Sequence, residues 1–181
     1  MIQVSASIRI ARPVSTVYRF IAVDFYRNYP RWSPEVVALT PLTPGPWREG
    51  ALARQVRVDQ GRRTDTTFRA TRMVPDRRML IDGVSAAYHA EYELEGEGED
   101  GTLLSFRFRL DRLDLFMLPF EKLISSALAE GASRTARNLK GLIELECPAA
   151  TTVALDHPFQ ALQPGFYPPL HEGAPHDHRH P

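Results

Sequence analysis

The stretch from Leu115 to Glu146 has the pattern of one long amphipathic helix, and it limits how the rest of the chain can fold. Apolar residues recur in it at spacings of three and four, which places them on one face of a helix. Pro119 suits a first helical turn, and Pro148 prevents the helix from continuing beyond Cys147. From Phe120 onward such a helix measures about 40 Å, which is long enough to cross the face of a small sheet.

The middle of this helix carries small side chains, whereas both ends carry Phe, Leu and Ile. The small residues include Ala127, Ala129, Gly131 and Ala132. A thin middle either lets another element pack closely or leaves an unfilled space, and the pattern alone does not separate the two. We therefore expect either tight helix-to-sheet packing or a cavity beside Leu128 and Ala132.

The residues before the helix predict one strand, two short helices and a run of antiparallel strands. Val4, Ala6, Ile8 and Ile10 alternate with polar residues, as in a strand with one buried face. Short helices are predicted after Pro13 and over 24–29, and alternating segments with short turns follow from 36 to 112. An antiparallel sheet with one solvated face needs cover for the other, and the long helix is large enough to supply it. This predicts an α+β fold with a curved sheet around the helix.

The composition indicates one globular domain followed by a tail of different character. The chain has 181 residues, 43% hydrophobic and 24% charged, which suits a single core. Its formal net charge is zero and the basic residues are scattered, which argues against a nucleic-acid partner. Seven of the fifteen prolines and five of the six histidines fall in 148–181. We therefore predict a domain over 1–147 and a Pro/His-rich tail over 148–181.

The sequence also suggests where the protein works. It contains one cysteine, Cys147, and its first residues lack the apolar core of a signal peptide. No apolar run reaches the length of a membrane span. We therefore expect a cytoplasmic protein without a membrane span. The sequence indicates no cofactor and leaves the oligomeric state open, a homodimer included.

Several short motifs resemble those of a known family. They are the segments Ile10–Pro13 and Tyr29–Val36, together with Val17 and Gly50, and the Tyr-Pro-Arg-Trp-Ser-Pro stretch is the most specific of them. With the order of elements, they resemble the polyketide cyclase/dehydrase branch of the START-like (SRPBCC) superfamily over residues 2–146. The resemblance implies the helix-grip fold, in which a seven-stranded sheet grips a long C-terminal helix around an apolar cavity. It implies no fixed catalytic residue, because members bind lipids, quinones or plant hormones, cyclise polyketides, or act through protein partners.

Three functions therefore stay open. The first is binding of a hydrophobic, partly oxygenated small molecule that is polyketide-, lipid- or quinone-like. The second is catalysis in the same cavity, as a polyketide cyclase, aromatase or dehydratase, and the third is a protein-interaction module. Convergent polar groups in the cavity would indicate an enzyme, and an almost apolar lining with one polar anchor would indicate a carrier. A closed core with an exposed apolar patch would indicate the interaction module.

Strand parity selects candidate residues on the face that would meet the helix. Arg54 shares the parity of three apolar neighbours, so its guanidinium is predicted to point inward and bind a ligand carboxylate or enolate, with a wet position at the sheet rim as the alternative. Tyr88 and Tyr92 would orient a ligand carbonyl or act as general acids, or else only pack in the core. These three residues are the catalytic candidates. The predicted ligand-binding set is Arg54, Thr66, Phe68, Tyr88, Tyr92, Phe106, Phe108, Leu128 and Ala132.

The histidines carry weaker signals. His89 has the parity of outward-facing residues, so we expect it on the surface. In the tail, His176, His178 and His180 stand at alternate positions and offer imidazole ligands for a divalent metal. They lie in a Pro/Gly segment without a scaffold, so no metal site is predicted.

Overall fold

The computed structural model describes residues 1–59, 61–112 and 115–149. The chain divides into two units, Met1–Thr151 and Thr152–Pro181, and only the first is described below. Nearly all of the predicted tail, including the three histidines considered as metal ligands, lies outside the described residues. The elements are β1 (Ile2–Ile10), α1 (Val14–Tyr18), the π-helical turn η1 (Arg19–Val23), α2 (Phe25–Trp32), β2 (Val36–Pro41), β3 (Leu52–Asp59), β4 (Arg62–Val74), β5 (Arg78–Gly83), β6 (Tyr88–Glu97), β7 (Gly101–Leu110), the 3₁₀-helical η2 (Leu115–Phe120) and α3 (Glu121–Glu146).

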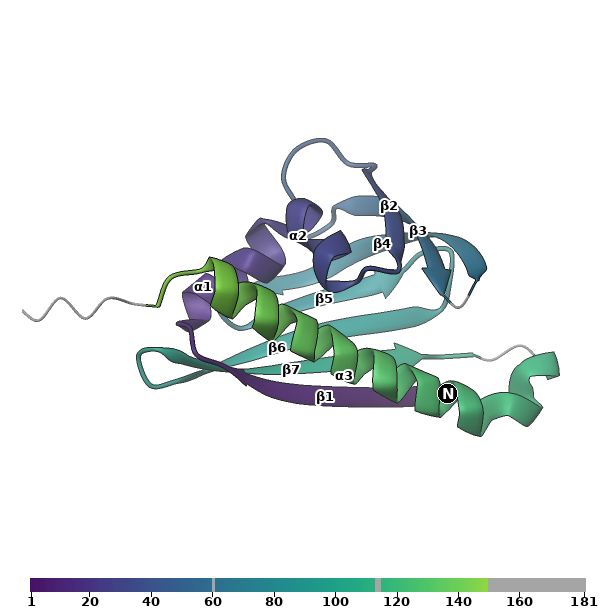
Figure 1. The fold of residues 1–181 in the computed structure, drawn as a ribbon. Coiled ribbons are helices and arrows are strands. Elements are labelled where there is room, and N and C mark those ends of the chain that lie inside the picture. The colour runs from purple at the N-terminus through teal and green to yellow at the C-terminus, as the bar shows by residue number, and fades with distance from the viewer. Residues whose placement is uncertain (60, 113–114, 150–181) are drawn as a thin grey trace, which may run out of the picture. The chain divides into compact units, whose positions relative to one another are not determined.

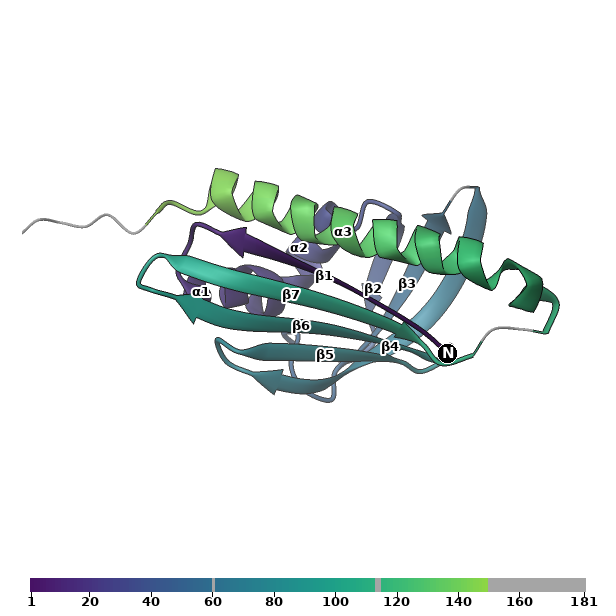
Figure 2. The same cartoon turned by 90° about the horizontal axis from the view of Figure 1, so that it is seen from below.

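The described strands form one antiparallel sheet in the order β1-β7-β6-β5-β4-β3-β2. β1 and β2 lie at opposite edges, so the helical segment between them crosses the width of the sheet. Figure 1 shows α1, α2 and α3 on one side of the sheet, and Figure 2 shows the strands curving beneath α3. The predicted α+β helix-grip architecture is confirmed.

The long helix differs in one respect from the sequence prediction. The predicted single helix over Leu115–Glu146 is divided into η2 and α3, and Pro119 lies inside the 3₁₀ segment. Proline lacks the N–H that a continuous α-helix needs, so the α-helical hydrogen bonds begin only after it. α3 then runs along β1 (Figure 2), and the Lys140 ammonium donates to the Arg9 carbonyl over 2.8 Å near its C-terminal end.

The two halves of α3 are packed differently. In the C-terminal half, Ala132, Ala136, Leu139 and Ile143 are buried at spacings of three and four. Between Glu121 and Gly131 every residue is half-buried or exposed. The helix is therefore anchored on the sheet by its second half.

An aromatic cluster joins α2 to the sheet. Phe25 is fully buried and stacks on Trp47, with ring centroids 4.4 Å apart. Trp32 is also fully buried, and the Asn138 amide of α3 donates to its carbonyl over 3.0 Å. α2 was predicted to end at Pro30 but continues through it to Trp32, because burial of the indole and the contact with α3 outweigh the single hydrogen bond that proline removes.

Within the described ranges, no helix combines the length and the apolar character needed to cross a lipid bilayer.

Candidate functional site

The inner face of the sheet, which turns toward α3, carries most of the predicted ligand-binding residues. Directly opposed residues of neighbouring strands point to the same face. The register places Tyr92 opposite Phe106, and Phe68 opposite Ala53, and all four belong to the buried core. The predicted residues found on this face are Thr66, Phe68, Tyr88, Tyr92, Phe106 and Phe108.

The predicted inward orientation of Arg54 is wrong. Its side chain is 56% exposed and points to the outer face, where its Nε donates to Asp65 Oδ1 over 2.8 Å. The register places Arg54 opposite Thr67, whereas Thr66, on the inner face, lies opposite Gln55. On β3 the apolar parity therefore belongs to the outer face. The inward-facing position that was predicted for Arg54 is occupied by its neighbour Gln55.

Gln55 is the centre of a buried hydrogen-bond network on the inner face. It is 3% exposed, and its Oε1 accepts a hydrogen bond of 2.9 Å from the Tyr29 hydroxyl. Its Nε2 donates to Thr66 Oγ1 and to the Tyr88 hydroxyl, over 3.2 Å in each case. The Thr66 and Tyr88 oxygens accept from the amide and the Thr66 hydroxyl also hydrogen-bonds to Tyr88, so the Tyr88 proton remains available for an oxygen of a bound molecule.

The phenols of this network are kept protonated. Burial raises the pKa of Tyr29 and of Tyr88, and also that of Tyr92 deeper in the same face. The guanidinium of Arg57 acts in the opposite direction on the pKa of Tyr29 and Tyr88, but burial prevails. At neutral pH the phenols are therefore hydrogen-bond donors.

Arg57 supplies the positive charge beside this network. It lies two positions after Gln55 on β3, and its guanidinium contacts Ser33 Oγ and Asp59 Oδ2, each at 3.2 Å. Glu35 lies 3.7 Å away and also pairs with Arg134 of α3. Sheet, loop and helix are thereby joined by alternating charges. We call Tyr29, Gln55, Arg57, Thr66 and Tyr88 the inner-face polar cluster.

Sequence reasoning missed three members of this cluster. Tyr29 was noted only as part of a family motif, and Gln55 and Arg57 were not considered. The signal was present in the hairpin: a turn over 60–62 pairs position 55 with position 66, so an inward Thr66 requires an inward Gln55.

α3 contributes the other two predicted residues. Ala132 is 2% exposed and belongs to the packed half of the helix, whereas Leu128 is half-buried. On the sheet, Tyr88 and Phe108 stack with ring centroids 5.7 Å apart and are half-buried too. The lining is therefore closed around Ala132 and partly open to solvent around Leu128. Whether these residues bind a ligand stays a prediction.

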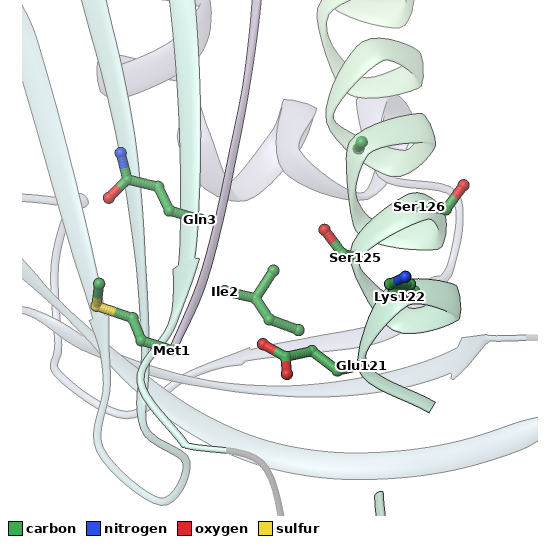
Figure 3. Close-up of a pocket in the computed structure, with 8 residues that line it drawn as sticks. Met1, Ile2, Gln3, Glu121, Lys122, Ser125 and Ser126 are labelled. Carbon is green, nitrogen blue, oxygen red and sulfur yellow. The ribbon is translucent and has the colours of Figure 1, made fainter. Parts of the chain in front are cut away.

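A groove opens beside this region, between β1 and the first turns of α3. Its volume is about 650 Å³. Figure 3 shows Ile2, Glu121 and Ser125 pointing into the space between strand and helix. The groove is lined by Met1, Ile2, Gln3, Glu121, Lys122, Ser125, Ser126 and Ala129.

The outer face of the sheet carries compensated charges. His89 lies there, as its parity predicted, with Nδ1 2.7 Å from Asp82 and Nε2 2.7 Å from Asp111. Partial burial lowers the pKa of His89, but the two hydrogen bonds to carboxylates outweigh it and raise the pKa above its usual value. Hydrogen bonding to His89 in turn lowers the pKa of Asp111. In the described part of the chain, no group of three or more His, Cys, Asp or Glu residues has the arrangement of a metal site.

Comparisons with known proteins agree with the architecture. The family profile described as "Polyketide cyclase / dehydrase and lipid transport" matches residues 1–144. No curated protein sequence matches the chain. Solved structures of similar fold include TTHA0849 from Thermus thermophilus, with a TM-score of 0.65 and 17% identity over 81% of this chain and 99% of that one. The ZhuI aromatase/cyclase from Streptomyces sp. R1128 has a TM-score of 0.65 and 16% identity over 82% and 97% of the two chains. A START superfamily protein from Mycobacterium smegmatis has a TM-score of 0.62 and 16% identity over 79% and 97%. At these identities the structures show the shared fold.

Proposed function

Because the chain belongs to the polyketide cyclase/dehydrase and lipid transport family, we propose that it binds a hydrophobic, partly oxygenated small molecule between the inner face and α3. The polyketide-, lipid- or quinone-like body would lie against Phe108 and Leu128, where sheet and helix are half-buried. Its oxygen atoms would meet the inner-face polar cluster. The cytoplasmic location expected from the sequence stays a prediction.

The buried network around Gln55 carries this proposal. Burying polar groups within an apolar layer is unfavourable unless each finds a partner. Gln55 donates to the oxygens of Tyr88 and Thr66 and leaves the Tyr88 proton for another acceptor, and Arg57 adds a cation beside them. A carbonyl, enolate or carboxylate oxygen would complete these donors. A purely structural core would gain more from apolar side chains of the same size.

A second candidate function is catalysis in the same place. Several polar groups converge here, which is what a cyclase or dehydratase requires. A protonated phenol such as Tyr88 would donate to a carbonyl oxygen, and the charge of Arg57 would stabilise the enolate that forms.

The binding proposal is tested with the fluorescent probe 1-anilinonaphthalene-8-sulfonate and by native mass spectrometry for a molecule that purifies with the protein. We expect Arg57→Met to weaken probe binding about tenfold and Tyr88→Phe about fivefold, because each removes a donor to the bound anion. Arg54→Met is the matched control, since it removes the same charge from the same strand on the outer face. Equal effects of Arg54→Met and Arg57→Met would contradict the proposal.

The two candidate functions are separated by a poly-β-ketone thioester analogue. Conversion by the unchanged protein, lost in Tyr88→Phe, supports the enzyme. Saturable binding without conversion supports a carrier.

A further inference from the structure

Exposed apolar side chains gather at one end of the unit Met1–Thr151. We call it the α3 end; it comprises Met1, the β3–β4 hairpin, the β5–β6 turn and the start of α3. The register places these segments together, because Leu110 pairs with both Ile2 and Tyr88, and the Asp111 amide donates to the Ala87 carbonyl over 3.0 Å. Figures 1 and 2 show the N terminus, the β3–β4 hairpin and the start of α3 at the same end. The exposed side chains there are Met1 (76%), Val84 (55%), Leu118 (48%), Phe120 (57%) and Leu123 (69%).

This exposure is concentrated rather than scattered. The described residues include nine exposed large apolar side chains, and the five above all lie at this one end. η2 has the sequence Leu-Phe-Met-Leu-Pro-Phe without a charged or polar residue, and the half of α3 that follows has no buried residue. Exposed apolar side chains concentrated at one end of a domain are typical of a site of interaction.

Basic side chains lie at the same end as the apolar ones. Four exposed cations lie at the α3 end: Arg62, Arg63, Arg112 and Lys122. None of them forms an ion pair with another residue in the described ranges, while the neighbouring Asp59 and Asp65 are already paired with other arginines. Glu121 is the exposed acid beside Lys122. The unpaired charges that the structure describes at this end are therefore mostly positive.

The opposite end of the sheet carries charges of both signs. The β6–β7 hairpin, where Glu97 pairs with Gly101, carries Glu95, Glu97, Glu99 and Asp100. Arg9, which pairs with Glu97, and the exposed Arg72 and Arg77 lie at this end too, so its charges largely offset one another. An anionic surface would therefore attract the α3 end more strongly than this one.

We propose that the α3 end docks on the surface of an anionic lipid bilayer. Phe120 and Leu123 would enter the boundary between headgroups and acyl chains, and the four cations would lie against the lipid phosphates. A second copy of this chain fits less well as the partner, because a symmetric contact would bring the four cations of one copy close to those of the other.

Docking would also place the groove between β1 and α3 at the bilayer surface. Met1 and Lys122 line that groove and belong to the α3 end as well (Figure 3). An apolar molecule would then pass between bilayer and protein without crossing water. The docking inference itself does not depend on which molecule the protein binds.

The test uses the full chain and vesicles of equal parts phosphatidylcholine and phosphatidylglycerol, with pure phosphatidylcholine vesicles as the charge control. In co-sedimentation, we expect binding to the mixed vesicles that weakens with added salt. The double variant Phe120→Ser/Leu123→Ser should reduce partitioning roughly tenfold or more, because it removes the two inserted side chains. Replacing Lys122 by Gln should reduce it about fivefold. Leu145→Ser is the matched control, since Leu145 is 82% exposed at the other end of the same helix.

Three outcomes overturn the proposal. One is absence of binding to the mixed vesicles by the unchanged protein. Another is an equal loss in Leu145→Ser and in the double variant, with thermal midpoints showing that both remain folded. The third is a dimer in light scattering that the double variant converts to a monomer, without vesicle binding, since the patch would then be a contact between copies. Probe binding measured without vesicles tests the proposed function separately.

Discussion

The two faces of the sheet surround their polar side chains in different ways. On the outer face, Arg78 and Arg107 form a ladder with Glu91 and Glu93, and all four side chains are between 23% and 42% exposed. On the inner face, Gln55 is 3% exposed and holds three hydroxyl groups. Water can replace a partner lost on the outer face but not one lost on the inner face. The burial of a polar group, rather than its charge, therefore decides what its removal costs.

The largest difference is expected between two neighbours on β3. Gln55→Ala should lower the free energy of unfolding by about 2–3 kcal/mol, because it strips the partners from Tyr29, Thr66 and Tyr88 in a buried site. Arg54→Ala removes an exposed partner of Asp65 on the outer face and should have a much smaller effect. Denaturant unfolding of both variants measures the difference. Equal losses would show that the two faces do not differ in this way.

A smaller effect is expected from removing one hydroxyl of the same network. Tyr29→Phe leaves the Gln55 carbonyl oxygen without its 2.9 Å donor and should cost about 1 kcal/mol. Tyr29→Phe made in the Gln55→Ala variant should lower the free energy of unfolding by less, since the acceptor of the Tyr29 hydroxyl is already absent. A double-mutant cycle of unfolding free energies measures this coupling. Additive losses would mean that the two residues act independently.

The strongest contribution on the outer face should come from His89, and it should depend on pH. Its folded pKa is raised, so its stabilisation is fully present below the unfolded pKa of about 6.5 and is lost as the pH rises through the folded pKa. Asp111 has a lowered pKa, so its contribution is present above its unfolded pKa of about 3.9 and is lost as the pH falls through the folded value. His89→Asn should therefore lower the thermal midpoint most at about pH 5–6 and least once the pH exceeds the raised folded pKa of His89. A loss that is constant with pH would contradict an imidazolium ring that is hydrogen-bonded to both Asp82 and Asp111.

The smallest effect is expected in the outer ladder. Arg107→Ala should cost at most about 0.5 kcal/mol, because Arg78 still pairs with both glutamates and solvent screens the exposed pairs. The loss should shrink further at high salt. A salt-independent loss comparable to that of Gln55→Ala would remove the distinction between the faces.

The sequence predicted the order of strands and helices correctly, but not the division of the long helix into η2 and α3. Apolar and polar residues alternate in Val4–Ile10 and in the last two strands. This alternation indicates which residues are buried, because it is typical of a strand with one face in the core and the other in solvent. It failed at β3, where Leu52, Val56 and Val58 belong to the outer face and the polar pair Gln55 and Arg57 to the inner one. There the apolar pattern and the hairpin register gave opposite answers, and register was the better guide because opposed residues cannot point to different faces.

By itself, then, the amino-acid sequence determined the helix-grip order: a strand, short helices, antiparallel strands and a long amphipathic helix. These follow from local periodicity, prolines and turns, which act over a few residues. Only the tertiary structure decided which polar side chains meet. Tyr29, Gln55 and Tyr88 come from three elements far apart in the chain, and their hydrogen bonds depend on strand register and on how α2 packs against the sheet. The tertiary structure also decided that α3 is anchored by its second half and leaves Phe120 and Leu123 in water, because whether an apolar residue is covered depends on the elements that reach it.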